Sequence, residues 1–200
     1  MGDRMNREQG FTLIELMVVI IIIGILVGIA IPQFTKTMET SKATDSVSLM
    51  ALIGNANRMF ALDHSQKFAS GAAPIDTACS ACGGCGTCPA ICNGATPPSC
   101  CLIACKYLST TDYDAKPYSF YAAASATGTG APSGCGTPTT CEGSSAVSGN
   151  ILACARRRPG TDPGGTDLCQ SDACFKDWGY AMDKNGVFGC YGVGVPPPPK

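Results

Sequence analysis

The strongest constraint on this chain is an apolar run near its N-terminus. Residues 16–31 read LMVVIIIIGILVGIAI, without a charged or hydrogen-bonding side chain. As one α-helix, residues 11–31 would be about 30 Å long, enough to cross the hydrocarbon core of a bilayer. A plain membrane anchor would account for the length and leave Glu15 unexplained. Since a charged side chain deep in lipid costs about 3 kcal/mol, we expect this carboxylate to have a partner.

The composition changes along the chain. The 200 residues carry a net charge of -1, so no overall attraction to nucleic acid or anionic lipid is expected. Residues 1–10 are polar, residues 32–70 are mixed, and residues 71–200 are rich in Gly, Pro, Ser, Thr and Cys. All 14 cysteines follow position 78. Dense cysteine in a segment with few large aliphatic side chains indicates an oxidising compartment outside the cytoplasm.

The N-terminal segment differs from an ordinary secretory signal peptide. Such a signal has a small-residue cleavage site after its apolar region, whereas this run continues into Pro32 and an amphipathic segment. The small residue Gly10 precedes the run instead. The leader MGDRMNREQG, residues 1–10, has no net charge, and translation from Met5 rather than Met1 would shorten it to MNREQG.

Residues 10–15 read GFTLIE, and an apolar run and Pro32 follow. This sequence resembles the class III signal of type IV pilins and type II secretion pseudopilins. The resemblance covers roughly residues 1–60. It implies that a prepilin peptidase cuts after Gly10 and that Phe11 is then N-methylated. It also implies that Glu15 pairs with the terminal amine of a neighbouring subunit. This pairing has a physical basis, because an ammonium and a carboxylate are each costly in lipid and less costly together.

The apolar run is expected to form the first part of a long helix. Gly24 and Gly28 are either a packing face for another helix or glycines tolerated in lipid. Pro32 removes one backbone donor and is expected to kink or locally melt the helix. We expect either one helix from about Thr12 to about Ala61 or two helices broken at Pro32.

The following segment, residues 32–64, is predicted to be an amphipathic helix. Its packed face is expected to contain apolar and small residues at helical spacing: Val47, Met50, Ile53, Asn57 and Phe60, with Ala43, Gly54 and Ala56 alongside. Polar residues, including Asp45 and Ser46, are expected on the opposite face. His64, the only histidine, would then lie near the helix end, where its charge favours the C-terminal carbonyls.

The cysteines are all candidates for disulfide bonds. They are Cys79, Cys82, Cys85, Cys88, Cys92, Cys100, Cys101, Cys105, Cys135, Cys141, Cys154, Cys169, Cys174 and Cys190. A domain with so little aliphatic core needs such support, and each bridge contributes about 2–4 kcal/mol. The pairing cannot be deduced from the sequence, although the adjacent Cys100 and Cys101 are expected to have different partners.

Two metal-based alternatives remain open for the cysteine-rich loop. The run CSACGGCGTCP, residues 79–89, is one residue short of a ferredoxin iron–sulfur motif at its fourth cysteine. Cys79 and Cys82, together with Cys100 and Cys105, would supply four thiolates for zinc, with a loose second spacing. An exported chain would have to receive an iron–sulfur cluster outside the cytoplasm, and oxidising surroundings disfavour the zinc site, so we predict no metal and no cofactor.

Later segments predict β-strands. Residues 117–122 and 150–155 are strand candidates, and residues 178–191 predict a hairpin around an Asn-Gly turn. We therefore predict an α+β fold: a long N-terminal helix with its apolar half protruding, packed on a small antiparallel sheet in a disulfide-stapled domain of residues 65–200. The pilin family has the same order of elements and fewer cysteines.

Signals for other functions are weak. Arg156-Arg157-Arg158 is either a solvated strand end or a phosphate-contacting patch. No aromatic residues are interleaved with it, so nucleic acid is not predicted as a partner. The chain has no Walker loop, G-x-S-x-G, H-E-x-x-H or paired-carboxylate motif. We therefore predict no catalytic residues and no enzymatic activity.

The resemblance predicts a structural role. The main hypothesis is a type IV pilus subunit: a precursor in the bacterial inner membrane that the assembly machinery there builds into a helical homo-oligomeric filament at the cell surface. Adhesion, motility or DNA uptake would depend on the filament. The first alternative is a pseudopilin of a type II secretion system, with the same N-terminal chemistry. The second is an exported, membrane-anchored metal or redox protein that uses its cysteine loop.

Overall fold

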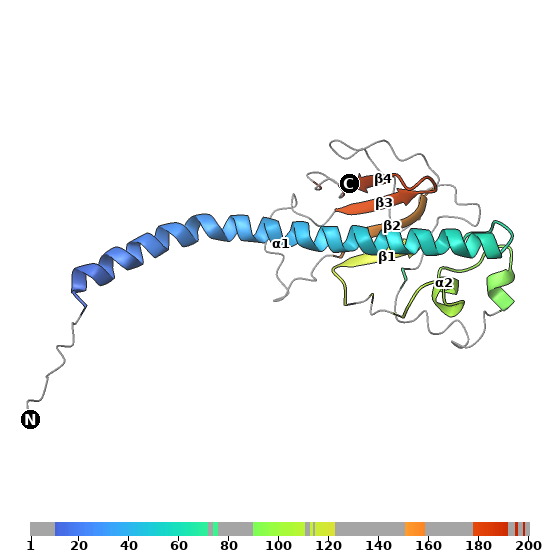
Figure 1. Ribbon diagram of the computed structural model, residues 1–200, viewed down its shortest axis with the longest axis horizontal. Coiled ribbons are helices and arrows are strands. Elements are labelled where there is room, and N and C mark those ends of the chain that lie inside the picture. The colour runs from blue at the N-terminus through green and yellow to red at the C-terminus, as the bar shows by residue number, and fades with distance from the viewer. Residues whose placement is uncertain are drawn as a thin grey trace, which may run out of the picture. The chain divides into compact units, whose positions relative to one another are not determined.

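The computed structural model describes residues 11–71, 74–75, 90–110, 113, 115–122, 151–158, 178–191, 195 and 198. Its elements are the helix α1 (Leu13–Asp63), the 3-10 helix η2 (Ala90–Asn93), the one-turn helix α2 (Cys101–Ala104), and the strands β1 (Tyr118–Ala122), β2 (Ile151–Arg157), β3 (Gly179–Asp183) and β4 (Phe188–Tyr191) (Figure 1). The chain divides into two compact units, Met1–Glu39 and Thr40–Lys200.

The helix α1 runs through Pro32 without interruption. The prediction of one long helix is confirmed, and neither the break nor the local melting considered at Pro32 occurs. A proline removes one N–H donor from the helical ladder. The turns on both sides keep their own hydrogen bonds, so the loss of one bond does not end a helix of 51 residues.

The sheet is antiparallel throughout, in the order β1-β2-β3-β4. The predicted hairpin is confirmed as β3 and β4. In its turn, Oδ1 of Asp183 accepts hydrogen bonds from the backbone N–H groups of Asn185 and Val187, both at 2.8 Å. Gly186 adopts a φ of +85°, a conformation that side chains disfavour. Arg58 of α1 donates to the carbonyl of Lys184 at 2.6 Å and so fixes the turn against the helix.

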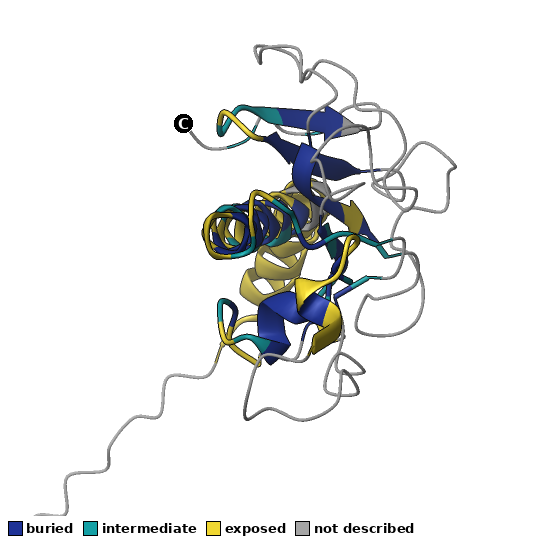
Figure 2. Cartoon of the chain, turned by 90° about the vertical axis from the view of Figure 1, so that its right-hand side faces the viewer, coloured by how far each residue is buried: buried dark blue, intermediate teal, exposed yellow. Residues whose placement is uncertain are grey.

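The part of α1 that belongs to the second unit packs on this sheet (Figures 1 and 2). The predicted packed face is confirmed, since these residues are all buried: Ala43, Val47, Met50, Ile53, Gly54, Ala56, Asn57 and Phe60. Gly54 allows close approach, because a Cβ there would lie 2.9 Å from Cε of Met182 on β3. The helix therefore rests almost directly on the strands.

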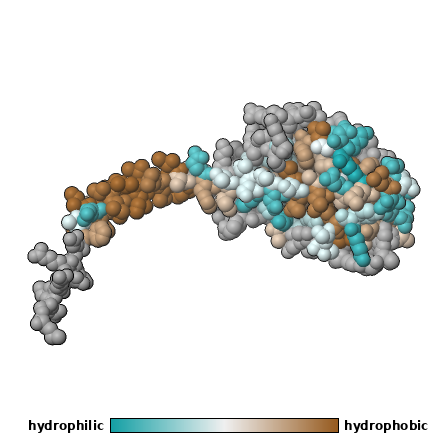
Figure 3. Space-filling model, viewed as in Figure 1, coloured by the Kyte–Doolittle hydropathy of each residue, from teal (hydrophilic) through white to brown (hydrophobic). Residues whose placement is uncertain are grey.

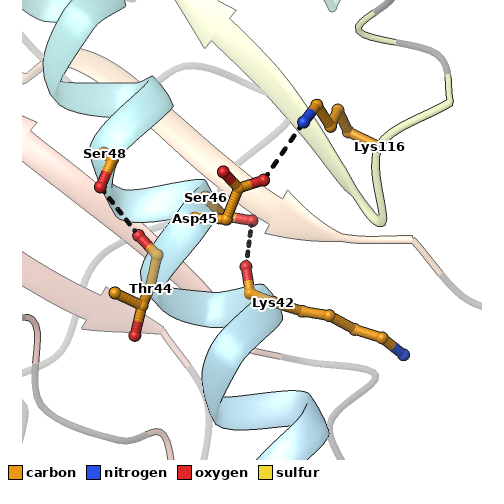
Figure 4. Close-up of polar contacts among 6 residues, drawn as sticks. All are labelled: Lys42, Thr44, Asp45, Ser46, Ser48 and Lys116. Atoms are coloured by element: carbon orange, nitrogen blue, oxygen red, sulfur yellow. Dashed lines mark hydrogen bonds and ion pairs between the residues drawn. The ribbon is translucent and has the colours of Figure 1, made fainter.

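Ser46 is buried, whereas the sequence pattern placed it on the polar face. Its hydroxyl donates to the carbonyl of Lys42 at 2.8 Å (Figure 4). This local bond satisfies the hydroxyl and removes the penalty for burying it. The neighbouring Asp45 is exposed as predicted and forms an ion pair with Lys116 at 3.3 Å (Figure 4). An exposed pair of this kind contributes about 0–1 kcal/mol.

Asn57 is the polar centre of the packed face and is completely buried. Its Oδ1 accepts a hydrogen bond from the Ala69 N–H at 2.8 Å. Its Nδ2 donates to the carbonyls of Ala69 at 3.0 Å and Leu152 at 3.2 Å. One side chain thus joins the helix to β2 and to the chain that returns after the helix.

The Cys92–Cys101 disulfide fixes the short loop beside α2. Both cysteines are completely buried. The same loop is bound to the segment after α1, because the Ser70 N–H donates to the Pro97 carbonyl at 2.8 Å. The bridge therefore stabilises a region whose regular structure is limited to η2 and α2.

Replacing Asn57 by Ala is expected to lower the free energy of unfolding by about 2–3 kcal/mol, because three buried backbone groups lose their partner. Urea denaturation of the detergent-solubilised chain measures this change. The matched control is Asn55→Ala on the exposed side of the same helix, where a change within about 0.5 kcal/mol is expected. Equal effects of the two substitutions would show that the buried contacts of Asn57 add nothing to stability.

Replacing both Cys92 and Cys101 by Ser is expected to lower stability by about 2–3 kcal/mol, because the unfolded chain regains the freedom of a short loop. The midpoint of urea denaturation, measured without reductant, tests this expectation. An unchanged midpoint would mean that the contact between Ser70 and Pro97 is sufficient to hold the loop.

Candidate functional site

The candidate site lies at the start of α1, where polar groups meet the apolar run. Thr12 precedes the helix and Glu15 lies in its first turn. The Thr12 N–H and the Thr12 hydroxyl both donate to Oε2 of Glu15, at 3.1 Å and 2.9 Å. In return, the Glu15 N–H donates to Oγ1 of Thr12 at 3.3 Å. This is a reciprocal capping box, which satisfies N–H groups that the helix start leaves without partners.

The partner found for Glu15 within its own chain is therefore Thr12. The sequence resemblance pointed to a partner from another subunit and assigned no role to Thr12. The signal was present, because a Thr with a Glu three residues later, ahead of an apolar run, is the pattern of a capping box.

Apart from Glu15, the segment Leu13–Ile31 of α1 carries only apolar side chains and glycines. Among the described residues, one segment is long and apolar enough to cross a membrane: Leu13–Ile31, 19 residues with a mean hydropathy of 3.1. None of it is buried in the chain's own fold. Figure 3 shows the apolar side chains gathered along this segment. Such a surface is stable in lipid or against other apolar helices and unstable in water.

The other residues predicted for processing and assembly lie around this segment. Gly10 lies outside the described residues. Phe11 directly precedes the capping box, and its side chain is 86% exposed. The backbone of Pro32 is part of α1. Apart from the helix's own backbone, no atom of the described residues lies within 4 Å of the Cβ that an alanine would introduce at Gly24 or Gly28.

Several predicted cysteines are in disulfides. Besides Cys92–Cys101, the cysteines Cys105, Cys154 and Cys190 are disulfide-bonded. A sulfur atom in a disulfide is not available as a thiolate ligand, so the alternative of a zinc site that uses Cys105 is wrong. Within the described part of the chain there is no cluster of residues suited to a metal ion. The iron–sulfur-like run, residues 79–89, falls outside that part, as do the candidates Cys79, Cys82, Cys85, Cys88, Cys135, Cys141, Cys169 and Cys174.

The arginine triplet does not form a uniform basic surface. Arg157 is buried, where its guanidinium donates to the carbonyls of Pro117 and Arg158 at 3.2 Å and 2.8 Å. Nε of Arg158 donates to Oγ of Ser119 at 2.7 Å. Arg156 is exposed. The expectation of a solvated strand end is wrong for Arg157, whose guanidinium binds carbonyl oxygens of its own domain.

His64 has a structural position after the end of α1. Its ring stacks on Phe60 with centroids 3.9 Å apart, and its Nδ1 lies 2.9 Å from the Phe60 carbonyl. Because a carbonyl can only accept, Nδ1 is the donor in this contact. Nearby, the Tyr107 hydroxyl donates to Asp63. Burial, assisted by Asp63, raises the pKa of Tyr107 to about 12, so this donor keeps its proton at neutral pH.

Part of the exposed face of α1 in the second unit is apolar. Leu52, Met59 and Leu62 recur on one side of the helix and are 49%, 58% and 71% exposed. Toward the start of this unit the same face is polar, with Ser41 and Asp45 exposed. The helical spacing predicted the buried face and did not single out these three side chains.

The N-terminal part of the chain matches known proteins. The family model described as Prokaryotic N-terminal methylation motif matches residues 5–31. A fimbrial protein of Pseudomonas aeruginosa is 41% identical over 73 residues, which are 36% of this chain and 47% of the relative. The type IV major pilin protein PilA of Myxococcus xanthus is 46% identical over 54 residues, which are 27% of this chain and 24% of the relative.

A second group of relatives comes from secretion systems. The type II secretion system core protein G of Klebsiella pneumoniae is 37% identical over 62 residues, which are 31% of this chain and 44% of the relative. The chain thus spans less than half the length of each of these relatives. No solved structure matches it. In its methylation motif and apolar helix, the chain is similar to type IV pilins and to pseudopilins of type II secretion systems.

Proposed function

We propose that this chain is a structural subunit of a type IV pilus filament, processed after Gly10 and polymerised through its N-terminal helix. The observation that carries the proposal is the helical segment Leu13–Ile31, which is unburied, is apolar apart from Glu15, and has this carboxylate in the capping box at its start. The role is structural and requires neither catalysis nor a cofactor.

The energetics of the apolar helix favour two environments. Burying one Leu or Ile side chain is worth about 1.5–3 kcal/mol, so the exposed side chains from Leu13 to Ile31 strongly disfavour water. Lipid and a bundle of identical apolar helices both remove them from water. Because the two environments are similar in polarity, the apolar side chains alone do not set the register between subunits.

Polar groups set that register in this proposal. Cleavage after Gly10 would create an ammonium at Phe11, next to the helix start. The carboxylate of Glu15 is the charge of opposite sign within the apolar helix. An ammonium of one subunit and a carboxylate of the next meet at only one axial offset, so their pairing selects the register and offsets the penalty for each charge in an apolar environment.

The rest of the chain is compatible with a precursor that starts in a membrane and ends in a surface filament. The precursor would sit in the bacterial inner membrane, where a prepilin peptidase and the assembly machinery act on it. The disulfide-bonded domain would lie outside the cytoplasm and form the filament surface, where bridges such as Cys92–Cys101 resist unfolding. The exposed residues Leu52, Met59 and Leu62 offer further apolar surface to neighbouring subunits.

A pseudopilin of a type II secretion system is the second candidate. Relatives named core protein G match over a similar length of chain, 62 residues for the Klebsiella pneumoniae protein. The N-terminal chemistry would be the same in both systems. The two candidates differ in their product, because a pilus subunit is recovered in surface filaments released by shearing.

The intact mass of the chain in sheared cell-surface material tests the proposal. The sample is alkylated without reduction. We expect a mass that begins at N-methylated Phe11 with no alkylated cysteine. The control is Gly10→Leu, which is expected to leave the uncut chain in the membrane. If the wild-type chain keeps residues 1–10 and stays in membranes, the proposal is wrong and the apolar segment is a plain membrane anchor. If the chain is processed but absent from sheared material, the pseudopilin is favoured.

Replacing Glu15 by Ala is expected to leave cleavage intact and to reduce assembled chain at least about tenfold, because one lost charge-assisted contact of about 1.5–3 kcal/mol has this effect on an equilibrium. The ratio of processed chain in sheared filaments to processed chain in membranes measures assembly. Glu15→Asp keeps the charge and should retain part of the assembly into filaments. Normal filaments from the Ala variant would rule out the ion pair.

A further inference from the structure

We propose that Asn93 is a site of spontaneous chemical modification, where the side-chain amide is converted to a carboxylate as the protein ages, and that Asn185 is protected from the same reaction. The chain contains two Asn-Gly dipeptides, Asn93-Gly94 and Asn185-Gly186. Asparagine reacts most easily when glycine follows it, because glycine has no Cβ to hinder the attack or restrict the backbone. The modification requires no partner and does not depend on the filament proposed above.

The reaction needs only atoms of the two residues and water. The backbone nitrogen of the glycine loses its proton and attacks the side-chain carbonyl carbon of the asparagine. A C–N bond forms, the side-chain amide leaves as ammonia, and a succinimide ring results. Water then opens the ring at one of its two carbonyls. The products are aspartate and isoaspartate, and each carries one more negative charge than asparagine.

Asn93 has surroundings that permit this attack. It ends η2, and both Asn93 and Gly94 are exposed. Within the described part of the chain, the Asn93 side chain takes part in no hydrogen bond. The Gly94 N–H donates to the Ile91 carbonyl at 3.2 Å, at the long end of the usual range. A single weak bond therefore holds the attacking nitrogen.

Asn185 is held by several bonds in the β3–β4 turn. Oδ1 of buried Asp183 accepts the Asn185 N–H at 2.8 Å, and Nδ2 of Asn185 lies 3.5 Å from Oδ2 of this carboxylate. The Gly186 N–H donates to the Asp183 carbonyl at 3.1 Å. Arg58 binds the Lys184 carbonyl at 2.6 Å. An attack by the Gly186 nitrogen requires rotation about Asn185, which breaks bonds in this set, including one to a charged group.

The modification places a new charge on a loop that stays closed. Asn93 follows Cys92, whose disulfide with Cys101 closes the loop, and the reaction leaves this bridge intact. The net charge of the chain, -1, becomes more negative by one. Because charge on a surface attracts or repels charged partners, an old copy of the chain would present a different loop from a new copy.

The test follows both sites in the detergent-solubilised chain during incubation in mildly alkaline buffer. Trypsin cuts after Lys and Arg, so Asn93 and Asn185 are the only asparagines in their peptides, residues 68–106 and 185–200. Mass spectrometry of the reduced and alkylated digest measures the converted fraction, with a sample taken before incubation as the baseline. We expect Asn93 to be converted at least about tenfold faster than Asn185, the effect of opening one hydrogen bond to a charged group.

Controls separate the surroundings of the two sites from their sequence. In urea with reductant both sites lose the folded surroundings, and similar rates are expected. In the folded chain, Arg58→Ala should speed the conversion of Asn185 and leave the rate at Asn93 unchanged. Isoelectric focusing of the intact chain gives a second measurement. Asn93→Gln should gain fewer acidic forms than the wild type, because the longer side chain closes a ring slowly, whereas the matched variant Asn185→Gln should gain as many.

Four results would overturn the proposal. They are an Asn93 that stays unconverted in the folded chain, equal or faster conversion of Asn185, an Asn93→Gln chain that gains acidic forms as fast as the wild type, and a rate difference that persists in urea. The last result would show that sequence sets the two rates and that the bonds of the β3–β4 turn protect nothing.

Discussion

At the start of α1, a carboxylate and the polar groups of one threonine meet beside a run of side chains that water does not accommodate. The Thr12 N–H and hydroxyl both donate hydrogen bonds to one carboxylate oxygen of Glu15, Oε2, at the helix start. The apolar segment Leu13–Ile31 has no contact in its own fold that would bury it. Such a surface is unstable in water, and in the proposed function lipid or other copies of the chain surround this helix.

The helix changes its character in the second unit. From Ala43 onward, apolar residues recur mainly on one side, and that side is buried against the sheet. Gly54 gives the close approach, while Asn57 and Arg58 tie the helix to the chain after it, to β2 and to the β3–β4 turn. One continuous helix thus serves as an apolar surface in the first unit and as the spine of a folded domain in the second.

The folded domain has few large aliphatic side chains, and other interactions add to its stability. Aromatic residues such as Tyr113, Tyr118 and Phe120 fill the core beside small alanines. The Cys92–Cys101 bridge fixes a region with little regular structure. Buried Arg157 is satisfied by carbonyls of its own domain, so the part of the sequence that looked most like an anion-binding patch is largely structural.

The sequence by itself determined the features that depend on spacing along one helix or one hairpin: the apolar span, the buried stripe of α1, the strands, and the turn at Gly186. Local periodicity and turn chemistry carry these signals. Only the tertiary structure decided that Ser46 and Arg157 are buried, that Cys92 pairs with Cys101, and that Asn57 bonds to distant carbonyls. These depend on which segments meet in space, and no spacing within one segment encodes a contact between residues far apart in the chain.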